Sequence, residues 1–262
     1  MTDIWDAIIY SQFLDARTRP ARDLLAAIPN AFSPNTCYDL GCGPGNSTIL
    51  LKERFQNANI IGIDSSTDML QKATADYPDI DFSKQDIATF EPLEKTDCIF
   101  ANASLHWVAN HDVLLPKLAK MLTDTGILAI QMPNNFHSTA HQTALHILQS
   151  NETWKDLSNK LCYGVLTNPM YDAPHYHDLL ADNKFSAILC WETTYFQEMN
   201  DHVAIFNWIK GAGLRPALVQ MNKQHLNQFE KIYVEMLQKK YPTQTNGKIL
   251  FPFRRLFLIG IK

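Results

Sequence analysis

Residues 39–45 read Asp-Leu-Gly-Cys-Gly-Pro-Gly and join a short apolar run to a helical pattern. Glycines at such a junction let the backbone turn tightly and approach a ligand that a Cβ atom would exclude. A dinucleotide site uses the spacing G-x-G-x-x-G, with a pyrophosphate on the helix N-terminus. Here the spacing is G-x-G-x-G, and Asp39 precedes it. A carboxylate there repels pyrophosphate but attracts a ligand with an ammonium and a sulfonium group, so the pattern favours S-adenosylmethionine over NAD.

Polar side chains also end the next three predicted strands. Asp64 ends an apolar run, where a carboxylate can accept hydrogen bonds from both hydroxyls of a ribose. Asp86 ends the third strand, where it can accept the adenine amino group beside the amide of Ile87, and Asn102 ends the fourth. Met69, in the helix after Asp64, packs either on the adenine or in the core.

Strands that alternate with helices must position these residues. The apolar runs predict strands at 36–40, 60–64, 80–85, 97–102 and 127–132, and helical spacing predicts helices at 47–55, 67–77 and 112–122. Such alternation is typical of a parallel sheet, whose ligands bind at the carboxyl ends of its strands. A further helix is expected to begin with Pro20 at its first helical position.

The regular alternation stops after Met132. We expect helices at 139–149, 202–208 and 226–237, and strands at 185–196 and 256–261, the last of them antiparallel. The predicted organisation is one α/β domain. Residues 1–133 form a cofactor-binding Rossmann-like core with an N-terminal helical segment. Residues 134–262 complete it with the last two strands and with helical cap insertions at about 134–182 and 200–248.

The order of motifs DLGCGPGNS, IIGIDSS, KQDI, IFANASLHW and GILAIQMP resembles class I S-adenosylmethionine-dependent methyltransferases over the whole chain. The segments 17–20 and 213–216, with NASLHW and AIQMP, are similar to the trans-aconitate 2-methyltransferase family. The resemblance implies a mostly parallel Rossmann-like sheet with a final antiparallel strand and a helical cap. It also implies methyl transfer to a carboxylate oxygen of trans-aconitate, with S-adenosylhomocysteine as the other product. The predicted cofactor contacts are Arg19, Asp39, Gly41, Gly43, Asn46, Asp64, Ser65, Met69, Asp86, Ile87 and Asn102.

Methylation of a carboxylate needs no general base, because the acceptor is already ionised at neutral pH. The site must instead place the acceptor oxygen and exclude water. Arginine binds carboxylates bidentately, so Arg215 is the first candidate for the acceptor, with Arg254 or Arg255 near the last strand, of which we select Arg254. Arg17 and Arg19 are further cations. His106 either donates to the acceptor or caps a short helix, and Trp107 is predicted to form a wall of the pocket; Tyr10 and Phe13 are predicted to lie over the cofactor.

Composition limits the remaining classes of partner and location. The net charge of −4 provides no basic field for a nucleic acid or an anionic membrane. The first twenty residues lack a basic segment followed by an apolar one, no stretch is long enough to span a bilayer, and the five cysteines form no C-x-x-C pair. We therefore expect a cytoplasmic monomer or weak dimer. His137 and His141 have a spacing that could hold zinc, but the sequence places no third ligand, so no metal is predicted.

Three other functions are compatible with parts of the sequence. The first is a methyltransferase for another small-molecule or acyl carboxylate, and the second is a non-catalytic protein that binds S-adenosylmethionine. The third, a nicotinamide-dependent oxidoreductase, is disfavoured by Asp39 and by the glycine spacing.

Overall fold

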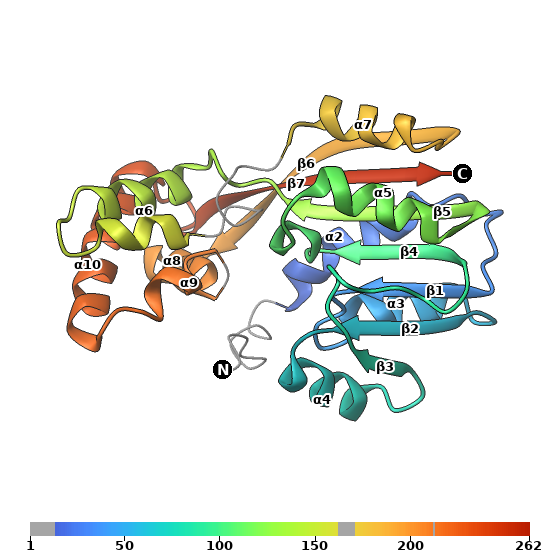
Figure 1. The fold of residues 1–262 in the computed structure, drawn as a ribbon. Helices are drawn as coiled ribbons and strands as arrows, with labels where there is room; N and C mark the ends of the chain where they lie inside the picture. The colour runs from blue at the N-terminus through green and yellow to red at the C-terminus, as the bar shows by residue number, and fades with distance from the viewer. Residues whose placement is uncertain (1–13, 162–170, 212) are drawn as a thin grey trace. The chain divides into compact units, whose positions relative to one another are not determined.

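The computed structural model describes residues 14–161, 171–211 and 213–262. Its centre is a seven-stranded sheet with the strand order β3-β2-β1-β4-β5-β7-β6. Registers along β2-β3, β1-β2, β1-β4 and β4-β5 are all parallel. β7 points against its neighbours in Figure 1, which confirms the predicted mostly parallel sheet with one antiparallel strand.

The first four strands begin and end within one residue of their predicted positions, and the fifth begins five residues earlier than predicted. The five strands are β1 (Thr36–Leu40), β2 (Asn59–Asp64), β3 (Asp81–Lys84), β4 (Thr96–Asn102) and β5 (Leu122–Pro133). Continuous apolar runs such as 127–130 are buried throughout, as expected of strands that are covered on both faces. Because these five strands are parallel, their carboxyl ends all lie at one edge of the sheet.

Helices connect these strands and cover them. The connections are α3 (Asn46–Arg54), α4 (Thr67–Asp76), the 3₁₀ turn η1 (Leu105–Trp107) and α5 (His111–Met121), with α2 (Leu14–Ala26) before β1 and α7 (Ala173–Asp182) before β6. α2 packs on α3, and α5 packs on α7. Ser66 caps α4 by accepting a hydrogen bond from the Met69 amide at 3.3 Å.

The remaining elements follow β5 and β6. They are α6 (Thr139–Gln149), the 3₁₀ segment η2 (Lys155–Lys160), β6 (Ala187–Met199), α8 (His202–Lys210), α9 (Arg215–Leu218), α10 (Lys223–Lys240) and β7 (Ile249–Ile261). α10 packs on α6 and α8 through an aromatic cluster in which the Phe229 and Tyr233 rings stack at 5.7 Å.

The chain divides into two compact units. The first comprises Met1–Met132, Tyr171–Thr193 and Arg255–Lys262; the second comprises Pro133–Met170 and Thr194–Arg254. β6 and β7 each run from one unit into the other. The second unit includes most of the residues predicted as cap insertions, whereas α7 belongs to the first.

The predicted starts of α2 and β7 are also wrong. Pro20 does not start a helix but lies inside α2, where it removes the hydrogen bond that its amide would make to the carbonyl four residues earlier. β7 begins at Ile249 rather than at residue 256. Pro252, Arg254 and Arg255 interrupt the apolar pattern and hide the first half of this strand from a reading of hydrophobic periodicity.

Candidate active site

The glycine loop leaves β1 with three positive φ angles, at Gly41, Gly43 and Gly45. A Cβ atom at Gly41 would lie 2.3 Å from Ser104 Cβ, so only glycine fits between the ends of β1 and β4. A Cβ at Gly43 would meet nothing within 4 Å. The loop is therefore packed against Ser104 at Gly41, whereas the space beside Gly43 is open. An open position of this kind lets a ligand approach the backbone.

Asp39 is completely buried at the end of β1. Its Oδ2 accepts hydrogen bonds from Ser47 Oγ and Thr48 Oγ1, both at 2.7 Å. Its Oδ1 has no hydrogen-bond partner among the described residues. Burial raises the pKa of this carboxyl to about 6, the two hydroxyls oppose the rise, and the charge of Asp64 adds to it. Asp39 thus offers one buried acceptor atom to a donor that the described part of the chain does not supply.

Asp64 links the glycine loop to the start of α4. Its Oδ2 accepts from the Gly43 amide at 2.9 Å, and its Oδ1 accepts from the Ser66 amide at 2.8 Å. The side chain is half-buried, and a carboxylate oxygen can accept from more than one donor. Ser65 beside it is exposed, while Met69, one turn into α4, is buried.

The residues that follow β3 and β4 lie at the same carboxyl edge of the sheet. Asp86 is exposed and holds its loop by accepting from the Ala88 amide at 2.9 Å. Ile87 extends towards Gly41, since its Cδ1 lies 3.2 Å from the position of a Cβ there. Asn102 carries a buried Oδ1 without a partner among the described residues. Ser104, which sequence reasoning missed, donates to the Leu40 carbonyl at 2.5 Å and ties β4 to β1.

His106 is buried in η1, directly after β4. Burial, then the charge of Arg255, then His111 lower the pKa of this imidazole to about 3, so it is neutral at physiological pH. Its Nδ1 has no partner within the described part of the chain. The half-buried Trp107 ring lies 5.0 Å from the His106 ring, tilted by 43°.

The predicted cations lie in three different environments. Arg255 in the first unit is buried at 4% exposure, whereas Arg254, selected from the sequence, is exposed in the second unit and donates its amide to Asn135 Oδ1 at 2.9 Å. Arg215, also in the second unit, is half-buried at the start of α9, with a buried Nε that has no partner among the residues described. Arg19 on α2 is exposed. The arginine next to His106 is therefore Arg255.

Other predicted residues lie away from this group or are not described. Asn46 is half-buried at the start of α3. Tyr10 and Phe13 fall outside the described residues. His141 is buried and shares a 2.7 Å hydrogen bond with Ser138 Oγ at the start of α6, and no three potential metal ligands gather anywhere in 14–161, 171–211 or 213–262.

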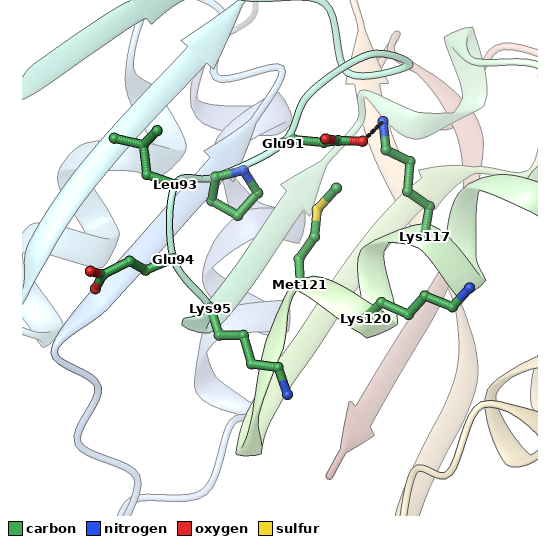
Figure 2. Close-up of a pocket in the computed structure, with 8 residues that line it drawn as sticks. Glu91, Leu93, Glu94, Lys95, Lys117, Lys120 and Met121 are labelled. Carbon is green, nitrogen blue, oxygen red and sulfur yellow. Dashed lines mark ion pairs between the residues drawn. The ribbon is translucent and has the colours of Figure 1, made fainter.

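A shallow hollow occurs in the first unit at the opposite edge of the sheet. It lies where β4 and β5 begin, between the 91–95 loop and the last turn of α5 (Figure 2). Lys117 and Glu91 pair across it at 3.8 Å, and Leu93 is fully exposed. The hollow contains none of the predicted site residues.

Known proteins with similar sequences supply the family. A model of the methyltransferase domain matches residues 33–183. Trans-aconitate 2-methyltransferase from Agrobacterium fabrum is 40% identical over 98% of this chain and 99% of its own length. The enzyme of the same name from Azoarcus sp. is 39% identical over 98% and 99%. The chain belongs to the trans-aconitate 2-methyltransferase family.

A solved structure supports the fold that this family membership implies. Phosphoethanolamine N-methyltransferase 2 from Haemonchus contortus, in complex with phosphomonomethylethanolamine and S-adenosylhomocysteine, superposes with a TM-score of 0.56. It covers 93% of this chain and 52% of its own, at 14% identity. The class I methyltransferase fold predicted from the motifs is thereby confirmed.

The matched methyltransferase domain contains most of the predicted family motifs. The glycine loop, Asp64, Asp86, Asn102 and His106 all lie within residues 33–183 and at the carboxyl edge of the sheet. The structure adds Ser104, Gln131 and Arg255 to this edge. Gln131, near the end of β5, is fully buried, and neither atom of its amide has a partner in the described residues. A glutamine inside the apolar run 127–132 was the available signal in the sequence.

Within the residues described, no helix is long and apolar enough to cross a membrane.

Proposed function

We propose that this protein transfers a methyl group from S-adenosylmethionine to a carboxylate oxygen of trans-aconitate, and releases the monomethyl ester and S-adenosylhomocysteine. The observation that carries the proposal is the identity of about 40% with trans-aconitate 2-methyltransferases over nearly the full length of both chains. The buried polar atoms at the carboxyl edge of the sheet that have no partner among the described residues are consistent with it.

The residues of this edge fit the cofactor. Asp39 Oδ1 is a buried acceptor for the ammonium group, and the open face of Gly43 leaves room for the ligand beside the loop. Asp64 is the proposed acceptor for the ribose hydroxyls, and Asp86 with the amide of Ile87 would hold the adenine. The remaining proposed contacts are Arg19, Gly41, Asn46, Ser65, Met69 and Asn102. The bound cofactor would supply an electrophilic methyl group on a sulfonium.

The protein's contribution to the reaction is placement rather than proton transfer. The attacking carboxylate oxygen forms the new C–O bond with its own electron pair, and the broken C–S bond leaves its pair on sulfur, so no proton moves. A neutral His106 suits this chemistry, because it adds no positive charge that would repel a sulfonium. We assign positioning of the acceptor to His106, Trp107, Arg215 and Arg254, as predicted from the sequence.

The test is methyl transfer from labelled S-adenosylmethionine to trans-aconitate, cis-aconitate, isocitrate and a medium-chain fatty acid, with a control that lacks an acceptor. Selective, base-labile labelling of trans-aconitate is expected. Labelling of another acid alone would replace the acceptor, and tight cofactor binding without any transfer would favour a non-catalytic binding protein.

The setting of the reaction is also a proposal. We infer a cytoplasmic protein that acts as a monomer or weak dimer on a small molecule rather than on a nucleic acid. Cys37, Cys42 and Cys98 are buried free thiols, which suits a reducing compartment, and the net charge of −4 disfavours polyanions. Sedimentation of the purified protein would test its oligomeric state, and its retention on a DNA column would test whether it binds nucleic acid.

A further inference from the structure

We propose that Gln131, His106 and Arg255 form the subsite that binds a carboxylate of the acceptor, and so determine its selection. The inference rests on the proposed function and adds residues to it. Its basis is two buried polar groups of the first unit, the Gln131 amide near the end of β5 and His106 Nδ1 after β4, which have no partner among the described residues, and the buried charge of Arg255 on β7.

Strand register places Gln131 and Arg255 on one face of the sheet. Asn102 pairs with Gln131 across β4 and β5. The Lys262 amide donates to the Gly126 carbonyl, and stepping along both antiparallel strands from that pair puts Gln131 opposite Phe257. Arg255 lies two residues from Phe257 and therefore projects from the same face as Gln131, because side chains alternate along a strand.

The amide of Gln131 is the strongest evidence for a ligand. It is fully buried, and neither its Nε2 nor its Oε1 has a hydrogen-bond partner among the described residues. Buried polar groups are nearly always paired, and an unpaired one carries the whole cost of its desolvation. Such a cost is typical of functional sites, where a ligand supplies the missing partner.

The charges favour a carboxylate as that partner. Arg255 is buried and lies close enough to His106 to lower its pKa. His111, the other titratable group near His106, is occupied by Tyr176 Oη at 2.6 Å and by the Leu105 carbonyl at 2.9 Å. Arg255 contributes a positive charge, and the Gln131 amide N–H groups and an N–H of neutral His106 are donors to a carboxylate.

The decisive experiment replaces Gln131 with methionine, which keeps the volume and removes the amide. The Gln131→Met protein is expected to melt about 2–4 °C higher than the wild type, because an unpaired polar group is lost. Its KM for trans-aconitate should rise at least about tenfold, the loss of one hydrogen bond to a charged group, while its Kd for S-adenosylmethionine stays within about twofold.

Gln142→Met is the matched control. Gln142 Nε2 donates to the Phe136 carbonyl at 2.7 Å, so this variant should lose stability and keep the KM of the wild type. Arg255→Lys keeps the charge but loses the planar fork, and should raise KM with little change in kcat. An unchanged KM in Gln131→Met, or a melting temperature that falls as in the control, would overturn the proposal.

Calorimetric titration separates this proposal from the proposed function. If no acid is methylated, the proposed reaction fails, and binding of trans-aconitate to the wild-type protein still tests the subsite. Binding that is lost in Gln131→Met supports the subsite; equal binding by both proteins, or none by the wild type, refutes it.

Discussion

The buried carboxyl of Asp39 should make the stability of the cofactor-free protein fall as the pH rises. Its pKa is raised from 3.8 to about 6 in the folded state. Between these values the folded protein binds more protons than the unfolded chain, so the free energy of unfolding decreases with pH. A difference of about two pKa units corresponds to about 3 kcal/mol in total, and about half of the loss falls above pH 5.

Urea denaturation of the wild type and of Asp39→Asn at about pH 5 and about pH 7.5 measures this effect. The asparagine amide alters the local hydrogen bonds by an amount that does not depend on pH, so it cancels between the two conditions. Other titrating groups are common to both proteins and cancel as well. The stability of Asp39→Asn relative to the wild type should therefore increase by about 1 to 2 kcal/mol from the lower to the higher pH.

Saturating S-adenosylmethionine supplies the second half of the test. An ammonium group at Asp39 Oδ1 stabilises the ionised carboxylate, so the pH dependence attributed to Asp39 should disappear in the complex. A stability difference between the two proteins that is constant with pH would refute the reasoning. A difference that shrinks as the pH rises would show that the pKa of Asp39 is lowered rather than raised.

Three further substitutions test the elements around the site. Gly41→Ala should cost at least about 2 kcal/mol and weaken cofactor binding, because its Cβ would lie 2.3 Å from Ser104 Cβ at a positive φ. Arg54→Ala should lower stability by about 2 kcal/mol in urea denaturation, since the guanidinium donates to three main-chain carbonyls at the end of α2. Tyr176→Phe should cost about 1–2 kcal/mol through loss of the 2.6 Å hydrogen bond to His111.

Each of these variants has a matched control in the chain. Gly247 also has a positive φ but no atom within 4 Å of its Cβ position, so Gly247→Ala measures the backbone strain alone. An equal loss in both glycine variants would argue against the collision with Ser104. Arg22 is exposed, and Arg22→Ala should change stability by less than about 0.5 kcal/mol. Tyr171 is exposed and donates to Asp112 Oδ2 at 2.7 Å, so Tyr171→Phe loses a hydrogen bond at the surface and should cost less than Tyr176→Phe.

Local patterns predicted most of the fold, and they also suggest the residues proposed to bind the cofactor. The predicted strand at 36–40 and helix at 139–149 match β1 and α6 at both ends. Their signals are local: an apolar run for β1, and helical periodicity with the Ser138 cap for α6. The glycine loop and Asp64 follow directly from their positions at strand ends. The start of α2 was wrong because a proline after a polar stretch is equally compatible with a helix start and a helix interior.

The acceptor side of the site depends on contacts that no local pattern contains. Arg254 and Arg255 are adjacent and chemically identical, and only the register of β7 against β5 decides which of them is buried beside His106. Gln131 resembles an interruption of an apolar strand until the burial of its amide is known. Long-range pairing, rather than composition, therefore determines these roles.

The two hydrogen bonds of Asp64 have a consequence for substitution at this position. The side chain proposed to read the ribose is also the one that anchors the Gly43 and Ser66 amides. An asparagine there has a single carbonyl oxygen and would release one of the two anchors. Asp64→Asn would therefore change the acceptor offered to the ribose and the anchoring of the loop together, so this substitution cannot alter one property without the other.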